Sequence, residues 1–404
     1  MIRRGFFSFT RVRTAARIAA LTALALSAPS CKSEQEKEAF QLRVAVPSEG
    51  AGFASALQQS LGVPMRPGHD VALLSNGAVF DGLEQEIRKA KSSIHVLLYI
   101  WEKGAASDRI VAAISSRAKA GVACRIVVDA FGSPDFAKDV QPALSAAGCD
   151  VRIFRPLPGS GDKLARNHRK VVVVDGRVGF TGGFGIRDSW LGDGVTGDGW
   201  RDANVRFTGP AVSDAQQAIA ENWQEAGGAL FPPDAFPASP PDGSGPASAA
   251  FVASTISPVL TRSERLVQLM IQAAKRRLWI ANAYFVPSKA ILEMIKRKAS
   301  EGVDVRLLMP GKKSDSKASA GAQHVEYGSL VERGVRVFEY MPSMMHAKTM
   351  VVDDELSVVA SINLDPLSLN KLEEVALVVQ DKAFAAQLAK TFEDDLTHAR
   401  AVTR

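Results

Sequence analysis

The feature that most constrains this chain is a short pattern, His-x-Lys-x4-Asp, that occurs twice. The copies read HRKVVVVD and HAKTMVVD, and they supply His168, Lys170 and Asp175 in the first half and His346, Lys348 and Asp353 in the second. The sequence has six histidines, and two of them lie in these copies. Repetition of one pattern in matching places indicates a duplicated unit and predicts two similar lobes.

The stretches that precede each copy predict the same order of helices and strands. In the first half we expect strands at 70–76, 93–101, 123–130 and 150–156, with helices at 80–92, 108–121 and 137–148. In the second half we expect helices at 263–277 and 288–302, with strands at 278–285, 303–310 and 334–340. This alternation predicts an α/β fold with a largely parallel central region. A stretch rich in Pro, Gly, Ser and Ala predicts a linker at 229–250, between lobes at 67–228 and 251–404.

The N-terminus has the composition of an export signal. Residues 1–30 contain five arginines and no acidic residue, followed by an apolar run too short for a typical membrane-spanning helix. Cys31 follows in LSAPSC, which resembles the bacterial lipoprotein pattern, and predicts lipidation of that cysteine. An uncleaved amphipathic anchor is the alternative. Residues 31–66 are interpreted as a tether and N-terminal extension, and we expect an exported protein associated with a membrane on its periplasmic side.

The charge of the chain argues against nucleic acid as a partner. The net charge is +6, but without residues 1–30 the chain has 44 basic and 43 acidic residues, a net charge of +1. Such a protein has no overall field that steers it to phosphate backbones. The remaining cysteines, Cys124 and Cys149, fit either a disulfide of an exported protein or two buried thiols.

The motif itself predicts the chemistry. Side chains alternate along a strand, so His168 and Lys170 share one face, whereas Asp175 lies on the other face and is interpreted as a turn and framework residue. One imidazole can attack phosphorus and form a phosphohistidine, and a second can protonate the leaving oxygen. Two lysines can neutralise the phosphate oxygens in the transition state. This chemistry requires no metal or cofactor, and the sequence has no Cys-x-x-Cys or similar ligand cluster.

The chain resembles the phospholipase D superfamily, and most of all its bacterial cardiolipin synthase branch. Besides the two motifs, the stretches that carry the resemblance are AYFVPSKAILEMIKRKASEGVDVRLLMPGKKSD, WRDANVRFTGPAV and SINLDPLSLNKLEEVALVV. The resemblance implies two lobes of mixed sheet and flanking helices related by a pseudo-twofold axis, with the active site at their interface. It also implies that the first-half histidine is the nucleophile and the second the general acid and base.

The resemblance extends to residues beyond each aspartate that bind phosphate or orient the histidines. In the second half these are Ser361, Asn363 and Glu374, and in the first half they are Gly183 and Asp202. The chain departs from the family pattern at Gly185, where an asparagine is usual, and at Ala360, where a glycine is usual.

The expected function is phosphatidyl transfer through a phosphohistidine, with phosphatidylglycerol as donor and acceptor. The expected partners are anionic phospholipid and the membrane surface, and one chain holds both motifs whatever its oligomeric state. The alternatives are phospholipid hydrolysis, a phosphodiesterase or nuclease, and a non-catalytic lipoprotein that binds through the same fold. The loop at 310–315 is placed after a strand, where it can border the site, while Trp101, Trp190, Trp200 and Trp279 fit either an acyl entrance or the core.

Overall fold

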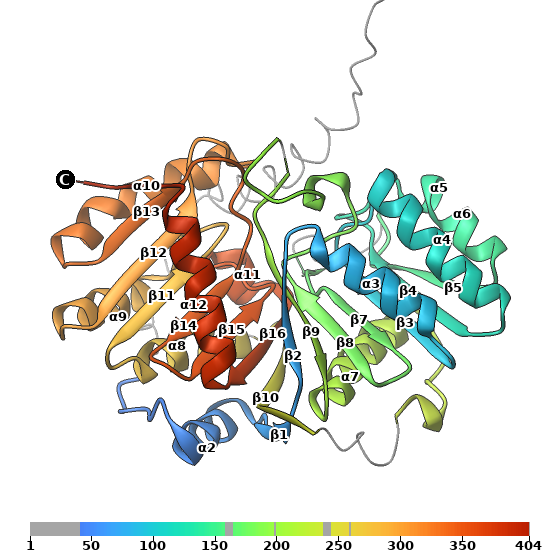
Figure 1. Ribbon diagram of the computed structural model, residues 1–404, viewed down its shortest axis with the longest axis horizontal. Coiled ribbons are helices and arrows are strands. Elements are labelled where there is room, and N and C mark those ends of the chain that lie inside the picture. Colours follow the sequence, from blue (N-terminus) through green and yellow to red (C-terminus); the bar gives the residue numbers. More distant parts are fainter. Residues whose placement is uncertain (1–40, 158–164, 198, 237–243, 258–259, 404) are drawn as a thin grey trace, which may run out of the picture.

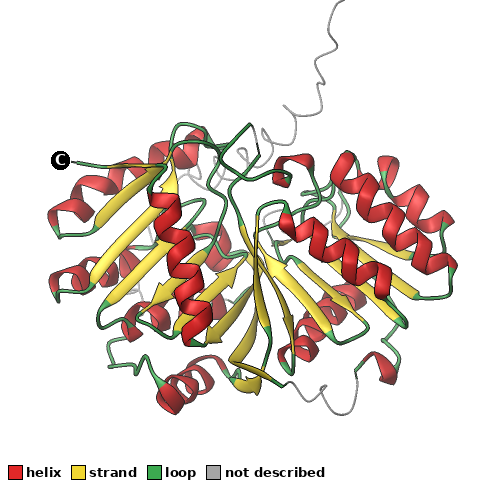
Figure 2. Cartoon of the chain, in the orientation of Figure 1, coloured by secondary structure: helices red, strands yellow, loops and turns green. Residues whose placement is uncertain are grey.

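The structure of the chain is a computed structural model that describes residues 41–157, 165–197, 199–236, 244–257 and 260–403. The predicted export signal and Cys31 lie outside the described residues. No helix within the described ranges is both long and apolar enough to cross a membrane. The chain folds into two sheets that lie side by side with helices over their faces (Figures 1 and 2).

The first lobe is built on a seven-stranded sheet, in the order β2-β9-β8-β7-β3-β4-β5. Its elements are β2 (Val71–Ser75), α3 (Ala78–Lys89), β3 (Ser93–Leu98), α4 (Ala105–Lys119), β4 (Ala123–Asp129), α5 (Phe136–Asp139), α6 (Gln141–Ala146), β5 (Asp150–Phe154), β6 (Arg166–Asn167), β7 (Val171–Val174), β8 (Val178–Gly182), η1 (Asp188–Trp190), β9 (Ala203–Thr208), α7 (Ala211–Glu225) and η2 (Pro233–Ala235).

The second lobe is built on a sheet that has ten strands among the described residues, in the order β1-β10-β16-β15-β14-β11-β12-β13-β17, with β6 paired to β16. Its elements are α2 (Gly50–Leu61), β1 (Arg66–Gly68), β10 (Gly245–Ser254), α8 (Arg262–Ala273), β11 (Arg277–Ala281), α9 (Lys289–Ser300), β12 (Asp304–Pro310), α10 (Lys317–Glu332), β13 (Arg336–Tyr340), β14 (Thr349–Val352), β15 (Leu356–Ala360), α11 (Pro366–Asn370), β16 (Leu372–Gln380), α12 (Lys382–Leu396) and β17 (Ala399–Ala401).

The two sheets repeat one strand order, as the duplicated sequence predicts. Strands β9-β8-β7-β3-β4-β5 of the first sheet correspond to β16-β15-β14-β11-β12-β13 of the second, and the motif strands β7 and β14 occupy the same place. The expectation of a largely parallel centre is wrong. Among the described strands of these two series, only β3-β4-β5 and β11-β12-β13 are parallel, and the motif strands run antiparallel to both neighbours.

A tight turn explains why the motif strand β7 is antiparallel to β8. Asp175 and Gly176 both have positive φ, 55° and 61°, which is the backbone of a two-residue hairpin turn. Such a turn returns the chain beside itself, whereas a parallel neighbour requires a long crossover connection. Among the described residues, a helix leads into each parallel neighbour: α4 precedes β4 and α6 precedes β5 in the first lobe, and α9 precedes β12 and α10 precedes β13 in the second.

The lobes share part of their hydrophobic core. Helix α7 of the first lobe packs against β10 of the second sheet, and α12 of the second lobe packs against β2 of the first. One buried cluster contains Ile219 of α7, Val205 of β9, Val375 of β16 and Leu388 of α12. Because these apolar side chains lose contact with water only when both lobes are in place, the lobes stabilise each other.

Two predicted connecting segments contain regular structure that belongs to the second lobe. Within the expected tether, helix α2 buries Phe53, Leu57 and Leu61 in the core that α8 and α9 also line. Within the expected linker, β10 begins at Gly245 and pairs with β1 and β16. Small residues gave the β10 stretch the composition of a linker, but they fit a strand whose two faces are both buried.

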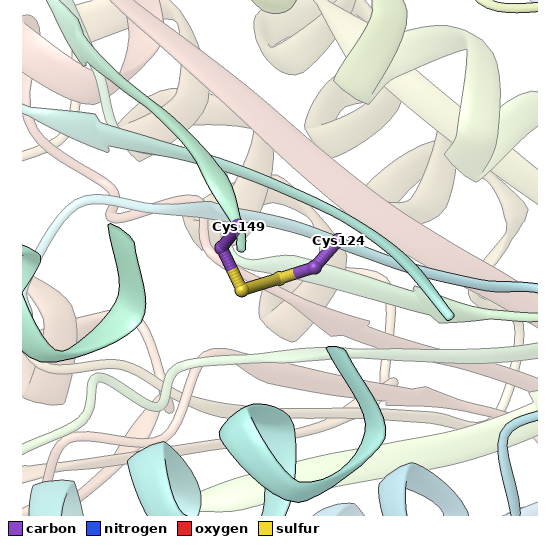
Figure 3. The surroundings of a disulfide bond; sticks show 2 residues. All are labelled: Cys124 and Cys149. Carbon is purple, nitrogen blue, oxygen red and sulfur yellow. A yellow bond between two sulfur atoms is a disulfide. The ribbon is translucent and has the colours of Figure 1, made fainter. Parts of the chain in front are cut away.

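Cys124 and Cys149 form a disulfide (Figure 3). Cys124 lies in β4, and Cys149 directly precedes the parallel strand β5. The disulfide therefore joins two neighbouring strands at the edge of the first lobe, and of the two alternatives for these cysteines the structure has the bonded one.

Candidate active site

Each motif histidine is held by the backbone of the opposite lobe. Strand β6, which directly precedes His168, pairs with β16, and the His168 amide donates to the carbonyl of Glu373 at 2.8 Å. In the same way the His346 amide donates to the carbonyl of Arg201 at 2.7 Å. The two motifs therefore meet at the interface between the lobes.

The acidic side chains that hold the imidazoles are exchanged between the lobes. Nδ1 of His168, in the first lobe, lies 2.8 Å from Oε1 of Glu374, in the second. Nδ1 of His346, in the second lobe, lies 2.8 Å from Oδ2 of Asp202, in the first. Each carboxylate engages Nδ1, which leaves Nε2 as the ring nitrogen available for chemistry. Each histidine is thus oriented by the lobe to which it does not belong.

The two carboxylates are not equivalent electrostatically. Asp202 also accepts hydrogen bonds from Nε1 of Trp190 at 2.7 Å and from the amide of Ala203 at 2.8 Å. Burial favours a raised pKa for Asp202, but the charge and hydrogen bond of His346 lead the interactions that lower its pKa overall. Burial dominates for Glu374 and raises its pKa to about 8.

The small residues beyond the motifs serve these carboxylates. The hydroxyl of Ser361 donates to Glu374, and the hydroxyl of Ser368 donates to it at 2.6 Å. At Gly183 a Cβ atom would lie 2.4 Å from Oδ1 of Asp202, so the absence of a side chain makes room for the carboxylate. The structure therefore places Ser361 and Gly183 next to the acids that orient the histidines.

The two lysines lie buried beside the imidazoles. Lys170 Nζ donates to the carbonyl of His168 at 2.7 Å, and Lys348 Nζ donates to the carbonyl of His346. Burial lowers the pKa of both ammonium groups, that of Lys348 to about 8. Burial, followed by the charges of the lysines, lowers the pKa of His168 well below its ordinary value and that of His346 to about 3. Both imidazoles are consequently neutral near pH 7, which is the state a nitrogen nucleophile requires.

The motif aspartates lie at the far ends of their strands. Asp175 accepts hydrogen bonds from the amides of three consecutive residues, 91–93, and Asp353 accepts from the amides of residues 275–277. These contacts tie each motif hairpin to the start of the neighbouring strand, β3 or β11. Among the described contacts of the two aspartates none involves a motif imidazole or lysine, so both have the contacts of a turn and framework residue.

One departure from the family pattern is Gly185, whose counterpart in the second lobe is Asn363. Asn363 is buried, donates from Nδ2 to Ser368 Oγ at 3.3 Å, and keeps its Oδ1 without a partner among the described residues. At Gly185 a Cβ atom would lie 2.9 Å from Cβ of Ile100 and 3.2 Å from the ring of Trp190. The first lobe therefore has no space for the side chain that the second lobe keeps.

Aromatic residues that the motif does not include complete the site. The ring of Tyr99 lies 4.9 Å from that of His168, while Trp200 and Trp190 lie 4.9 Å and 5.2 Å from His346. Tyr284 lies 6.4 Å from His346. A signal for the tyrosines was present in the sequence, because each follows the first central strand of its lobe, β3 or β11. Nothing in their own composition identified Trp190 and Trp200, which fitted the core equally well.

The described residues contain no group of three His, Cys, Asp or Glu side chains placed to hold a metal ion. The groups present at the site, two imidazoles with their carboxylates and two lysines, suit nucleophilic attack on phosphorus, proton transfer to and from oxygen, and neutralisation of phosphate oxygens.

Comparison with known proteins agrees with this site. The family model described as "Cardiolipin synthase, PLD-like domain" matches residues 83–221 and 267–396, which include both motifs. Cardiolipin synthase A of Pseudomonas putida (strain GB-1) is 32% identical, over 88% of this chain and 74% of that protein. Cardiolipin synthase 1 of Bacillus anthracis is 28% identical, over 91% of this chain and 76% of that protein.

Among solved structures, phosphatidylserine synthase of Haemophilus influenzae Rd KW20 has the same fold. It superposes with a TM-score of 0.67 at 14% identity and covers 86% of this chain and 92% of its own. The sequence matches span both lobes and both motifs, and the chain belongs to the cardiolipin synthase family of phospholipase D-like enzymes.

Proposed function

We propose that the protein transfers a phosphatidyl group from one phosphatidylglycerol to the alcohol of a second, which yields cardiolipin and glycerol. The observation that carries the proposal is the pair of neutral, buried imidazoles, each oriented by a carboxylate of the opposite lobe and each flanked by a buried lysine. The similar proteins named cardiolipin synthase support the choice of substrate.

In the proposed mechanism Nε2 of His168 attacks the phosphorus of the donor lipid. The bond from phosphorus to the glycerol oxygen breaks, and His346 gives that oxygen a proton as it leaves. The negative phosphodiester raises the pKa of His346 when it binds, because an opposite charge nearby favours the protonated imidazole. In the second step the acceptor hydroxyl attacks the phosphohistidine, its proton passes to His346, and the electron pair of the phosphorus–nitrogen bond returns to His168.

Hydrolysis is the second candidate, because water can replace the alcohol in the second step without any change in the residues. The direct test supplies phosphatidylglycerol vesicles to the purified protein and identifies the products by mass spectrometry. Cardiolipin supports transfer, phosphatidic acid alone supports hydrolysis, and degradation of plasmid DNA with no change in the lipid supports a nuclease. A protein that consumes neither substrate is the non-catalytic alternative.

The two histidines test the covalent route in the same assay. His168→Ala and His346→Ala should each abolish turnover, because each imidazole has its own step, and radioactive phosphatidyl label should become attached to the wild-type protein. Activity should persist in EDTA, since the lysines supply the charge that a metal would otherwise bring. A variant that keeps more than about a tenth of the wild-type rate contradicts two-histidine catalysis.

We also propose that the protein is exported and attached to a membrane through a lipid on Cys31. The basic and apolar N-terminus and the position of Cys31 support this proposal. Cys31→Ser should move the protein from the membrane fraction to the soluble fraction or leave its signal uncleaved, because a multiply acylated cysteine holds a protein firmly. Unchanged fractionation and processing would refute the lipid anchor and leave the enzymatic proposal intact.

A further inference from the structure

Four polar and aromatic side chains next to His346 have no part in the two proposed chemical steps. They come from both lobes: Arg187 and Trp200 from the first, Tyr284 and Asp315 from the second. Trp200 and Tyr284 pack against one another in a small apolar cluster with Met344. The rings of both lie close to the imidazole of His346, at 4.9 Å and 6.4 Å between centroids.

Arg187 presents a cation whose hydrogen-bonding capacity is largely unused. Its Cζ lies 4.4 Å from the ring centroid of Trp200 and 5.0 Å from that of Trp190, and its side chain is 13% exposed. Its Nε is buried and has no hydrogen-bond partner among the described residues. The nearby carboxylate of Glu102 lies 3.6 Å from Nη1, beyond hydrogen-bond distance, and its Oε1 is also unpartnered there.

A buried guanidinium with open donors needs an explanation, because an unmade hydrogen bond of a buried group is costly. The planar fork of arginine matches the two free oxygens of a phosphodiester. The donor phosphate already has two lysines, Lys170 and Lys348, beside the histidines. The open donors of Arg187 therefore fit a second phosphodiester, at some distance from the reacting one.

Asp315 supplies the complementary group. The hydroxyl of Tyr284 donates to its two carboxylate oxygens at 2.8 Å and 2.9 Å. A carboxylate has about four acceptor sites, so further hydroxyl groups can bind to it. On the His168 side the comparable carboxylate, Asp129, is already occupied by Arg166 and by backbone amides. The site is therefore asymmetric, and the open carboxylate and the open guanidinium are both on the side of His346.

We propose that Arg187, Trp200, Tyr284 and Asp315 form the acceptor subsite, where Arg187 binds the phosphodiester of a glycerophosphate headgroup and Asp315 binds its hydroxyls. This inference rests on the proposed transfer reaction. The two phosphates of the product are separated by one glycerol. The ring of Trp200 lies close both to the guanidinium of Arg187, at 4.4 Å, and to the imidazole of His346, at 4.9 Å, and that imidazole takes the proton of the attacking hydroxyl. Arg187 and Asp315 together select a phosphate-bearing polyol over water as the acceptor.

The experiment compares three acceptors with one donor lipid: glycerol, glycerol 3-phosphate, and phosphatidylglycerol. Arg187→Gln should lower transfer to the two phosphate-bearing acceptors at least about tenfold relative to glycerol in the same preparation, the effect of one lost charge-assisted hydrogen bond. Arg187→Lys keeps the positive charge but not the planar guanidinium, so it should lower transfer to the phosphate-bearing acceptors less than Arg187→Gln does. Asp315→Asn and Tyr284→Phe should lower transfer to all three acceptors relative to hydrolysis.

A matched control is Arg206→Gln, because Arg206 pairs with Glu86 at 3.2 Å, partly buried in the first lobe and away from the histidines. It should leave the ratios between acceptors unchanged. If Arg187→Gln lowers transfer to glycerol as much as transfer to the phosphate-bearing acceptors, the assignment is overturned. A loss confined to phosphatidylglycerol would also overturn it, because that result would indicate a contact with the lipid chains and not with the phosphate. If the wild-type protein makes no transfer product from any acceptor, it is the proposed function that fails.

Discussion

The exchange of carboxylates between the lobes makes a prediction that separates the two histidines. Asp202→Asn and Glu374→Gln each replace by an amide the carboxyl group of one Nδ1 contact of 2.8 Å. We take His168 as the nucleophile and His346 as the general acid and base. The change at Asp202 should then impair the general acid, His346, although Asp202 belongs to the first lobe. Glu374, from the second lobe, should affect the nucleophile.

The structure sets the size of the effect. A hydrogen bond to a charged group contributes about 1.5–3 kcal/mol, which is about 10- to 150-fold in rate if it is realised in the transition state. The amide of Asn fits the site of Asp202 in neither orientation. Oδ2 receives Nε1 of Trp190 and Oδ1 receives the amide of Ala203, so the NH2 group faces a donor either way. We therefore expect a loss near the upper end of the range.

The assay uses a phosphatidyl ester of p-nitrophenol, whose leaving group needs little protonation. In Asp202→Asn the rate of the p-nitrophenol burst, which reports the first turnover, should fall by less than about tenfold. The rate of later turnovers, which need a base, should fall about a hundredfold. The phosphohistidine should then accumulate. Glu374→Gln should lose the burst itself. A larger burst defect in Asp202→Asn than in Glu374→Gln would refute the assignment of the two histidines. Asp395→Asn removes a carboxylate that pairs with Arg201 across the same interface at 2.6 Å, and it controls for lost stability.

Four further predictions concern single groups. Because the pKa values of Lys348 and Glu374 are both about 8, kcat/KM should fall as the pH rises above about 8 and both groups lose a proton, and Lys348→Arg should remove the part of that limb that belongs to Lys348. Asp175→Asn should lower the free energy of unfolding by about 1.5–3 kcal/mol and spare the kcat of the folded protein. Burial raises the pKa of Asp175, but hydrogen bonds from backbone amides lower it overall. The difference in unfolding free energy between the wild type and Asp175→Asn should therefore be present above about pH 4 and vanish in acid. Urea unfolding at several pH values measures it. Reduction of the Cys124–Cys149 disulfide, which closes 25 residues, should cost about 3 kcal/mol of unfolding free energy in the same measurement. Asn363→Ala should lower kcat/KM at least about tenfold. The buried Oδ1 of Asn363 has no hydrogen-bond partner among the described residues, so we expect the substrate to supply one.

The sequence predicted which histidines and lysines come together at the interface and where the strands of the parallel series lie, because both depend on local pattern. The motif located His168 and Lys170, which the structure places in the segment between β6 and β7 and not within a strand, and the repeat located the second pair. The sequence did not predict that β7 and β14 are antiparallel to their neighbours, although the turn residues Asp175 and Gly176 were visible. Strand–helix alternation describes only the part of each lobe that has helical crossovers, and the motif hairpin lies outside it.

What the sequence could not predict is decided by contacts between lobes. An alignment of the halves pairs Asp202 with Glu374 but does not say which histidine each one reaches, because that depends on how the two lobes are docked. Helix α2 and strand β10 were assigned to connecting segments for a similar reason. Their buried faces are visible only once the second lobe supplies the surface against which Phe53 and Ala249 pack.

Docking of the lobes is therefore a condition for catalysis as well as for stability. A single lobe contains a histidine and a lysine, but its imidazole has no carboxylate on Nδ1, and its backbone amide lacks the carbonyl that the other lobe provides. The shared core and the ion pair between Arg201 and Asp395 hold the lobes in the register that these contacts need. Since each histidine depends on the opposite lobe, two copies in one chain can diverge without losing the site. The open Asn363 in one lobe and the closed Gly185 in the other are differences of the kind that separate a donor side from an acceptor side. So are Asp315, which accepts from the hydroxyl of Tyr284, and Asp129, which pairs with Arg166 and accepts from backbone amides.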